Sequence, residues 1–371
     1  MDLKNTLIVA TLAAAFACGG GSSGTPYQTP TPFTAEAVFR SAKNIQTHAA
    51  VLNLVANAQA NHIGTLVVAA KQDEDDEMPS GTVFYASAIA PQATPGFDPL
   101  LDVITEAHKV GIQVKAWVPQ FHDQVAFHKD PSWPMQALVG GVVSNYTGAT
   151  PGTAYFVNPC SPAVQAYELS ILEEIVTNYG IDGLVLDWIR YDNWNMDMSA
   201  GTRAAYLAAN PGAVDPLNVN LATDNADRRS WQAWRTDQIG NYVKAVRTRV
   251  NALKPGLPLG IFILPPEFVE VGQDAAKFAS QIDFVCPMCY WVDWGFPPNW
   301  VASGVLKDTA AKVGPGVKIL PTLGLLYPAG DLKQVNAAIR AQYPTITSLD
   351  FFQYWTWNAA NFQAADALRK Q

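Results

Sequence analysis

Cysteine and histidine are scarce in this sequence of 371 residues, which contains four Cys and five His. If Cys18 is set aside, the odd number that remains (Cys160, Cys286 and Cys289) excludes a fully disulfide-paired scaffold. Cys286-Pro-Met-Cys289 lies in an apolar run, and no second Cys-x-x-Cys or His-rich element completes a zinc site. A metal-dependent deacetylase is disfavoured because no His/Asp cluster has a recognisable ligand spacing. We therefore expect buried free thiols and no metal.

Charge is also sparse, because only 15% of the residues are charged whereas 49% are apolar. This balance is typical of a globular protein and excludes a disordered one. Asp and Glu number 32 against 24 Lys and Arg, a net charge of −8, and no long basic cluster is present to follow a phosphate backbone. Nucleic acid is therefore not an expected partner. No Gly-x-Gly-x-x-Gly turn follows the first expected strand, which argues against a doubly wound dinucleotide-binding sheet, and we expect no cofactor.

The first 24 residues differ in composition from the rest. Lys4 precedes the apolar stretch Leu7–Phe16, which is too short to span a bilayer permanently and is typical of a secretory signal. The small residues before Cys18 and the Gly/Ser tract after it resemble a bacterial lipobox and tether, which predicts lipidation at Cys18; ordinary signal cleavage is the alternative. Residues 25–33 form a Pro/Thr-rich linker, and no other segment looks transmembrane. We expect an exported protein anchored by lipid to a bacterial membrane, in the periplasm or at the cell surface.

The stretch Tyr179–Asp192 combines a buried strand with a carboxylate at its end. The apolar run Leu184–Leu186 follows a helical pattern, and Asp187 ends the run beside aromatic and charged residues. Because side chains alternate along a strand, Asp187 shares a face with Val185 and Ile189. If that face is the interior of a barrel, Asp187 points into the mouth. The alternative is an Asp that caps the next element, although caps seldom interrupt an apolar strand.

Strands and helices alternate from residue 34 to the end of the chain. Apolar strands are predicted at 35–42, 62–70, 113–121, 184–187, 259–264, 282–291, 317–325 and 349–357. Helices are predicted after them at 45–60, 98–110, 162–179, 231–253, 273–280, 300–313, 332–343 and 359–369. This order predicts the α/β class and a (β/α)8 TIM barrel, a single domain over residues 34–371 with long βα loops at 122–158 and 192–226.

Chemistry in such a barrel lies at the carboxyl ends of the strands, where carboxylates and indoles gather in this sequence. Asp187 and Glu267 are the predicted catalytic pair, with Asp187 as nucleophile or stabilising carboxylate and Glu267 as acid/base. The alternative for Glu267 is an acid on a surface loop. The expected substrate-binding residues lie at or near other strand ends: Trp117, His122, Asn158, Arg190, Asp192, Tyr290, Trp291, Asp293, Tyr354, Trp355 and Trp357.

Several of these assignments have a purely structural alternative. The tryptophans that follow the predicted strands are as readily core residues, since Trp is highly buried on average. Arg190 is expected to pair with either Asp187 or Asp192. The acidic run 71–77 is either a solvated loop or a lining of the mouth, where Asp73 and Glu74 would hold a cation.

Four blocks of the sequence together resemble a known family. Phe97–Pro119, the helix start Asn158-Pro159, Tyr179–Tyr191 and Phe284–Trp291 resemble successive blocks of the glycosyl-hydrolase-like family 10 barrel proteins. The resemblance covers roughly residues 35–370 and implies an exported bacterial protein that acts on bacterial glycans, including amino-sugar polymers such as peptidoglycan strands. The family's strand-four signature usually carries two consecutive acids, whereas this chain has Asp187-Trp188. Only Asp187 is carried over.

Together these patterns predict a monomeric, exported and lipid-anchored glycoside hydrolase that cleaves a cell-wall or extracellular polysaccharide by carboxylate acid/base chemistry. The alternative is a non-catalytic glycan-binding lipoprotein on the same barrel, because aromatic residues at strand ends also suit binding without turnover. The two differ in whether Asp187 is required for turnover or only the aromatic residues are required for binding.

Overall fold

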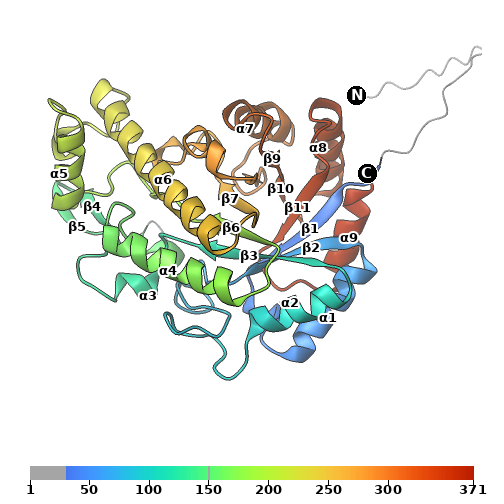
Figure 1. Cartoon of the computed structure of the whole chain (residues 1–371). Helices are drawn as coiled ribbons and strands as arrows, with labels where there is room; N and C mark the ends of the chain where they lie inside the picture. Colours follow the sequence, from blue (N-terminus) through green and yellow to red (C-terminus); the bar gives the residue numbers. More distant parts are fainter. Residues whose placement is uncertain (1–30, 149–150) are drawn as a thin grey trace, which may run out of the picture. The chain divides into compact units, whose positions relative to one another are not determined.

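Parallel strands pair in chain order around a closed barrel in the computed structural model, which describes residues 31–148 and 151–371 (Figure 1). The last strand in the chain, β11, pairs with the first, β1, and β10 pairs with both β11 and β8, so the ring closes. This confirms the predicted (β/α)8 barrel. Its strands are β1 (Thr34–Phe39), β2 (Ile63–Ala69), β3 (Gln113–Pro119), β6 (Gly183–Asp187), β7 (Leu259–Ile263), β8 (Phe284–Cys289), β9 (Lys318–Ile319) with β10 (Thr322–Gly324), and β11 (Ser348–Gln353).

The seventh barrel strand is divided into β9 and β10 because Pro321 has no N–H to donate to the ladder. The predicted signal segment, the lipidation site Cys18 and linker residues 25–30 lie outside the described residues. No helix in residues 31–148 and 151–371 is long and apolar enough to cross a membrane. In the same range Cys286 and Cys289 are buried free thiols, as expected, and Cys160 is a half-buried one.

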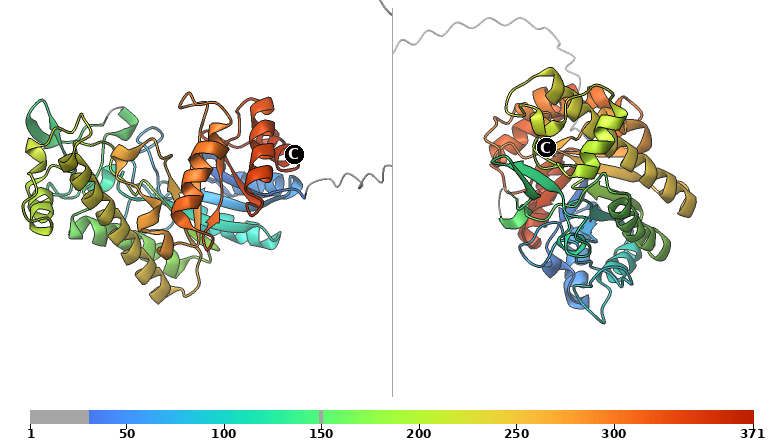
Figure 2. Two further views of the ribbon diagram at one scale, coloured as in Figure 1. Left: turned by 90° about the horizontal axis from the view of Figure 1, so that it is seen from above. Right: turned by 90° about the vertical axis from the view of Figure 1, so that its left-hand side faces the viewer.

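Helices surround the barrel, as Figures 1 and 2 show. Ser161 caps α4 by accepting from the backbone N–H of Val164 at 3.5 Å, with Pro162 at the first helical position, as predicted. Asp98 caps α2 by accepting from the N–H of Leu101 at 3.0 Å. The helices that follow barrel strands are α1 (His48–Ala60), α2 (Pro99–Lys109), α4 (Pro162–Asn178), α6 (Ala226–Leu253), α7 (Lys307–Val313), α8 (Ala329–Gln342) and α9 (Ala359–Arg369).

The helix predicted at 273–280 does not form. Two 3-10 turns, Ala275–Lys277 and Ala279–Gln281, connect β7 to β8 instead. The long helix α6 approaches this connection closely, because a Cβ on Gly240 would lie 3.1 Å from the backbone oxygen of Lys277. The connection therefore packs directly against α6. The helix predicted at 300–313 forms, but it begins as a π-helical segment, Val301–Leu306, before α7.

The two long βα loops contain more regular structure than the sequence predicts. In the first loop, α3 (Gln124–Phe127) precedes a hairpin of β4 (Gln136–Val139) and β5 (Val142–Asn145), and the second loop contains α5 (Ala200–Ala209). The hairpin turn, Gly140-Gly141, has φ angles of 58° and 82°, which glycine adopts readily. The hairpin and α5 lie together at one end of the barrel unit (Figures 1 and 2), packed around a satellite core of Met198, Tyr206, Trp231 and Trp234.

Alternating side chains fill the barrel in layers. Glu36 and Asp350, register partners on β1 and β11, form a buried polar layer with Lys115 of β3, whose Nζ lies 2.6 Å from Oε2 of Glu36. Two positions later along the same strands, the side chains are apolar and line the pocket described below: Val38, Trp117 and Phe352. The strand period of two therefore separates a charged barrel interior from the binding surface.

Gly260 on β7 is expected to tolerate no side chain. A Cβ there would lie 2.0 Å from Cε2 of Phe284 on the neighbouring strand. We expect Gly260→Ala to lower the free energy of unfolding in urea by about 1–3 kcal/mol, as overpacking of a filled core does. Gly316→Ala is the matched control, because a Cβ there meets nothing within 4 Å. Equal stabilities of the two variants would contradict this packing.

Candidate active site

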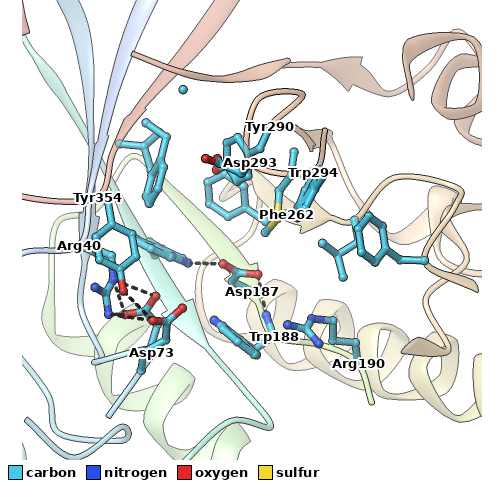
Figure 3. A pocket seen from close by; sticks show the side chains of 18 of the residues that line it. Arg40, Asp73, Asp187, Trp188, Arg190, Phe262, Tyr290, Asp293, Trp294 and Tyr354 are labelled. Carbon is cyan, nitrogen blue, oxygen red and sulfur yellow. Dashed lines mark hydrogen bonds and ion pairs between the residues drawn. The ribbon is translucent and has the colours of Figure 1, made fainter. Parts of the chain in front are cut away.

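A pocket of about 840 Å³ opens at the carboxyl ends of the barrel strands. In Figure 3, Asp187 lies between the Arg40–Asp73 pair and the rings of Tyr290 and Trp294. One part of the lining is acidic and basic: Arg40, Asp73, Glu74, Asp187, Arg190 and Asp192. The other part is aromatic: Phe262, Phe268, Tyr290, Trp294, Tyr327, Phe352, Tyr354 and Trp355. Carboxyls beside aromatic rings suit a ligand rich in hydroxyl groups with apolar ring faces.

Two N–H groups hold the Asp187 carboxyl at the end of β6. Oδ1 accepts from the backbone N–H of Trp188 at 2.7 Å, and Oδ2 accepts from Nε1 of Trp117 at 3.1 Å. Burial raises the pKa of Asp187 to about 7; the charge of Asp73 adds to this rise, whereas the Trp188 N–H, Arg190 and Trp117 oppose it. Near neutral pH a substantial fraction of the molecules therefore carries the proton that a general acid must donate.

Arg190 pairs with Asp192 and not with Asp187. Its Nη1 lies 3.2 Å from Oδ1 of Asp192, and Oδ2 of Asp192 accepts from the hydroxyl of Tyr146. The Arg190 guanidinium lies over the ring of Trp188, 4.1 Å from its centroid. This geometry decides between the two partners that the sequence allows, and it leaves both oxygens of Asp187 to N–H donors.

The acidic run after β2 lines the mouth because Arg40, at the end of β1, draws it inward. Nε of Arg40 donates to both oxygens of Asp73 at 2.9 and 3.1 Å, and its Nη1 lies 2.7 Å from Asp76. Glu74 accepts from the hydroxyl of Tyr354 at 2.8 Å. Burial raises the pKa of Asp73, but the contacts with a buried guanidinium favour its ionised form. Burial and the charge of Asp73 also raise the pKa of Glu74.

Arg40 therefore occupies the position among these acids where a cation was considered from the sequence. Within the described residues, the one group of three His, Cys, Asp or Glu side chains with metal-compatible spacing is His48, Asp102 and Glu106. It belongs to the outer helices α1 and α2, and none of its members lines the pocket.

The structure places seven of the eleven predicted substrate-binding residues in the pocket lining: Trp117, Arg190, Asp192, Tyr290, Asp293, Tyr354 and Trp355. Among the aromatic residues that the structure describes, Trp355 is the most accessible, with 59% of its surface exposed. By contrast, Trp291 and Trp357 are core residues with 1% and 2% exposure, so only some of the predicted tryptophans line the pocket. Trp357 Nε1 donates to the backbone oxygen of Val38 at 3.1 Å.

His122 and Asn158 lie behind the lining rather than in it. His122 is fully buried, contacts the backbone oxygen of Asp73 through Nδ1, and packs against the ring of Trp188. Burial lowers the pKa of His122 to about 4, so it is neutral near pH 7. Asn158 donates from Nδ2 to Asp197 at 2.6 Å and fixes the loop after β6.

Glu267 is not brought to the pocket. Its side chain is exposed and accepts from Nε1 of Trp300 at 2.7 Å, whereas its neighbours Leu264 and Phe268 line the pocket. Glu270, three residues later, lines the pocket instead.

The sequence did not reveal Arg40, which follows a weak strand, or most of the aromatic residues of the pocket lining. The alternation of β7 and β11 would have located Phe262 and Phe352.

Comparison with known proteins finds one matching family and several similar proteins. The model of the family described as glycosyl hydrolase-like 10 matches residues 38–319. The S-layer-related protein of Niallia circulans is 26% identical over 243 residues, which cover 58% of this chain and 15% of that protein. Glycosyl hydrolase DigH of Escherichia coli (strain K12) is 24% identical over 249 residues, which cover 57% of this chain and 53% of DigH. The matched region is therefore about half of DigH and a small part of the S-layer-related protein.

Among solved structures, the glycoside hydrolase domain of PgaB (BpsB) from Bordetella bronchiseptica is similar, with a TM-score of 0.71. The similarity covers 91% of this chain and 98% of that domain at 15% identity. At this identity it shows a shared fold, and the roles of individual side chains rest on the geometry above.

Proposed function

This chain belongs to the glycosyl hydrolase-like 10 family, and on that premise we propose that it hydrolyses glycosidic bonds, with Asp187 as the central carboxyl. The observation that carries the proposal is a buried, two-donor-bound Asp187 at the base of a pocket that combines further carboxyls with an aromatic wall. Glycoside hydrolysis needs one carboxyl that donates a proton to the leaving oxygen and a second that stabilises the oxocarbenium centre or activates water.

We assign Asp187 as the proton donor, because burial keeps it partly protonated at neutral pH. We assign Asp73 as the stabilising carboxylate, in place of Glu267, because it lines the same pocket, interacts electrostatically with Asp187 and is bound by Arg40. The aromatic side of the pocket would stack on sugar ring faces, with Trp355 as a platform at the rim.

The proposed substrate is a bacterial cell-wall or extracellular polysaccharide. The N-terminal apolar stretch and the residues around Cys18 support export and lipid anchoring of a monomer to the cell envelope. A pocket of about 840 Å³ is large enough for several sugar units, which fits a polymeric substrate better than a monosaccharide.

The decisive experiment measures product and binding on the same glycans. The purified chain from residue 25 onward is incubated with denuded peptidoglycan, chitin-like oligosaccharides and bacterial exopolysaccharide, and reducing ends and product masses are followed. A hydrolase releases shorter oligosaccharides from at least one of them. Saturable binding by calorimetry without any product would support the glycan-binding alternative. The exposed Trp355 favours this alternative because its ring could stack on a sugar without turnover.

The pH dependence of turnover is expected to report the role of Asp187. If Asp187 donates the proton, kcat/KM falls as pH rises through about 7, because the carboxyl is then ionised. If Asp187 is instead the nucleophile or stabilising carboxylate, kcat/KM rises through the same pH. The measurement is kcat/KM between about pH 4 and 9 on the best substrate. A profile that is flat around neutrality would contradict both assignments.

A further inference from the structure

The residue after Asp187 has a backbone conformation that bulky side chains seldom adopt. Trp188 has a φ of 50°, in the left-handed region, and only His62 shares a positive φ among the non-glycine residues in the described part of the chain. Such a conformation costs on the order of 1–3 kcal/mol and persists only where the surroundings enforce it. This conformation belongs to the residue next to Asp187, the proposed proton donor.

Contacts around the Trp188 ring hold the backbone in this conformation. The ring packs on His122 with centroids 4.7 Å apart, meets the edge of Phe156 at 5.7 Å, and lies beneath the guanidinium of Arg190. The peptide oxygens on both sides are also fixed. Asp187 O accepts from Gln120 N at 2.9 Å, and Trp188 O accepts from Phe121 N at 3.2 Å.

We propose that Trp188 is a positioning residue, whose packed ring holds the left-handed backbone and thereby directs its own N–H at Oδ1 of Asp187. This inference rests on the proposed role of Asp187. The 187–188 peptide carries both the Asp187 carbonyl and the Trp188 N–H. With the Trp188 carbonyl held by Phe121, a change of φ at Trp188 to negative values would require this peptide to rotate, which breaks the bond from Gln120 N and turns the N–H away from Oδ1. Because that N–H occupies Oδ1 at 2.7 Å, the proton of the neutral carboxyl is left to Oδ2, where the contact with Trp117 is longer.

Other groups also face Asp187. Trp117 donates from β3, Arg190 lies on the loop after β6, Asp73 follows β2, and the hydroxyl-bearing ring of Tyr290 follows β8. The guanidinium of Arg190 lies on the Trp188 ring, so a comparison of two variants that both lack the ring isolates the effect of the backbone. Loss of the Trp188 N–H removes a bond that stabilises the carboxylate and should therefore raise the pKa of Asp187.

The test compares Trp188→Ala with Trp188→Gly, because both remove the ring but only glycine adopts a positive φ without cost. Carbon-13 NMR of Asp-labelled protein follows the titration of Asp187, whose signal is assigned by its loss in Asp187→Asn. We expect a higher midpoint in Trp188→Ala than in Trp188→Gly, by about half a pKa unit or more, and a midpoint near wild type in Trp188→Phe. Where turnover is measurable, kcat should fall in the order Phe, Gly, Ala, with smaller changes in KM.

Equal midpoints in the Ala and Gly variants would overturn the proposal, since the ring would then act only by excluding water. If Trp188→Ala does not fold, Phe156→Leu removes one contact on the ring and should raise the midpoint by less; no shift in that variant would count equally against it. The titration needs no substrate, so an inactive wild-type protein with the expected Ala–Gly difference would reject the hydrolase assignment and keep the positioning role.

Discussion

Asp187→Asn is expected to lower kcat by about 10²–10⁴-fold, the range that loss of a positioned general acid costs. The variant keeps the size of the side chain and an oxygen that can accept from the Trp188 N–H, but it has no acidic proton to give to the leaving oxygen. Because the change affects a group needed only as bonds break, the loss should appear in kcat more than in KM. The measurement is release of reducing ends under saturating glycan.

The fold of this variant should survive. The pKa of Asp187 is raised in the folded state, so the native protein binds that proton more tightly than the unfolded chain does. The wild type therefore loses the stability contributed by the Asp187 proton as pH rises from about 4 to about 7. The Asn variant has no such proton, so its stability should not show this decrease. At pH 8 we expect a melting temperature at or above that of the wild type. An inactive variant that melts far below the wild type would leave the catalytic assignment without support.

Glu267→Gln is the matched control for Asp187→Asn. Glu267 was the acid/base partner expected from the sequence, yet it contacts Trp300 outside the pocket lining. A Gln keeps an oxygen for that hydrogen bond, so kcat should stay near the wild-type value. A loss in Glu267→Gln as large as in Asp187→Asn would mean that the loop carries Glu267 into the pocket when a glycan binds, and it would restore the pair expected from the sequence.

The sequence was sufficient to predict the barrel and the position of Asp187, because both follow from periodicity. Each strand is a short apolar run between helical patterns, and alternation along β6 turns Asp187 toward the mouth without knowledge of any other segment. The predicted helix at 273–280 is replaced by two 3-10 turns that pack closely against α6, a contact with a distant segment that local periodicity does not report. The β4–β5 hairpin was missed because four-residue strands carry too little alternation.

The partner carboxylate was beyond the reach of sequence reasoning for a related reason. Asp73 belongs to a run of acids that looks like a solvated loop, and its place in the pocket depends on a guanidinium 33 positions earlier. Conversely, Glu267 follows its strand at a suitable spacing, but its side chain contacts Trp300 while Phe268 and Glu270 line the pocket. Alternation predicts which way a residue within a strand points, whereas the loop after a strand is positioned by contacts with other loops.

Lys71→Met is expected to destabilise the protein by about 3–5 kcal/mol, the cost of removing one member of a buried ion cluster. Lys71 Nζ lies 2.7 Å from Asp123 Oδ2 and 2.6 Å from Glu168 Oε2, and all three side chains are fully buried. Their charges raise the pKa of Lys71 in spite of burial, so the lysine is a cation in the native state. Without it, Asp123 and Glu168 lose the cation that they share in a site that water does not reach.

The pH dependence of this defect has a defined sign. Burial raises the pKa of Glu168 well above its usual value even with Lys71 present, and loss of the cation can only raise it further. A folded-state pKa above the unfolded value favours folding at low pH, so the defect should be smallest near pH 4 and grow as pH rises. Urea unfolding at several pH values measures the destabilisation, and adding Glu168→Gln to Lys71→Met should restore part of the lost stability.

Lys277→Met, which breaks a surface pair with Asp237, is the control and should unfold like the wild type. A Lys71→Met protein as stable as this control at pH 8 would show that the buried cluster contributes no more to stability than a surface ion pair.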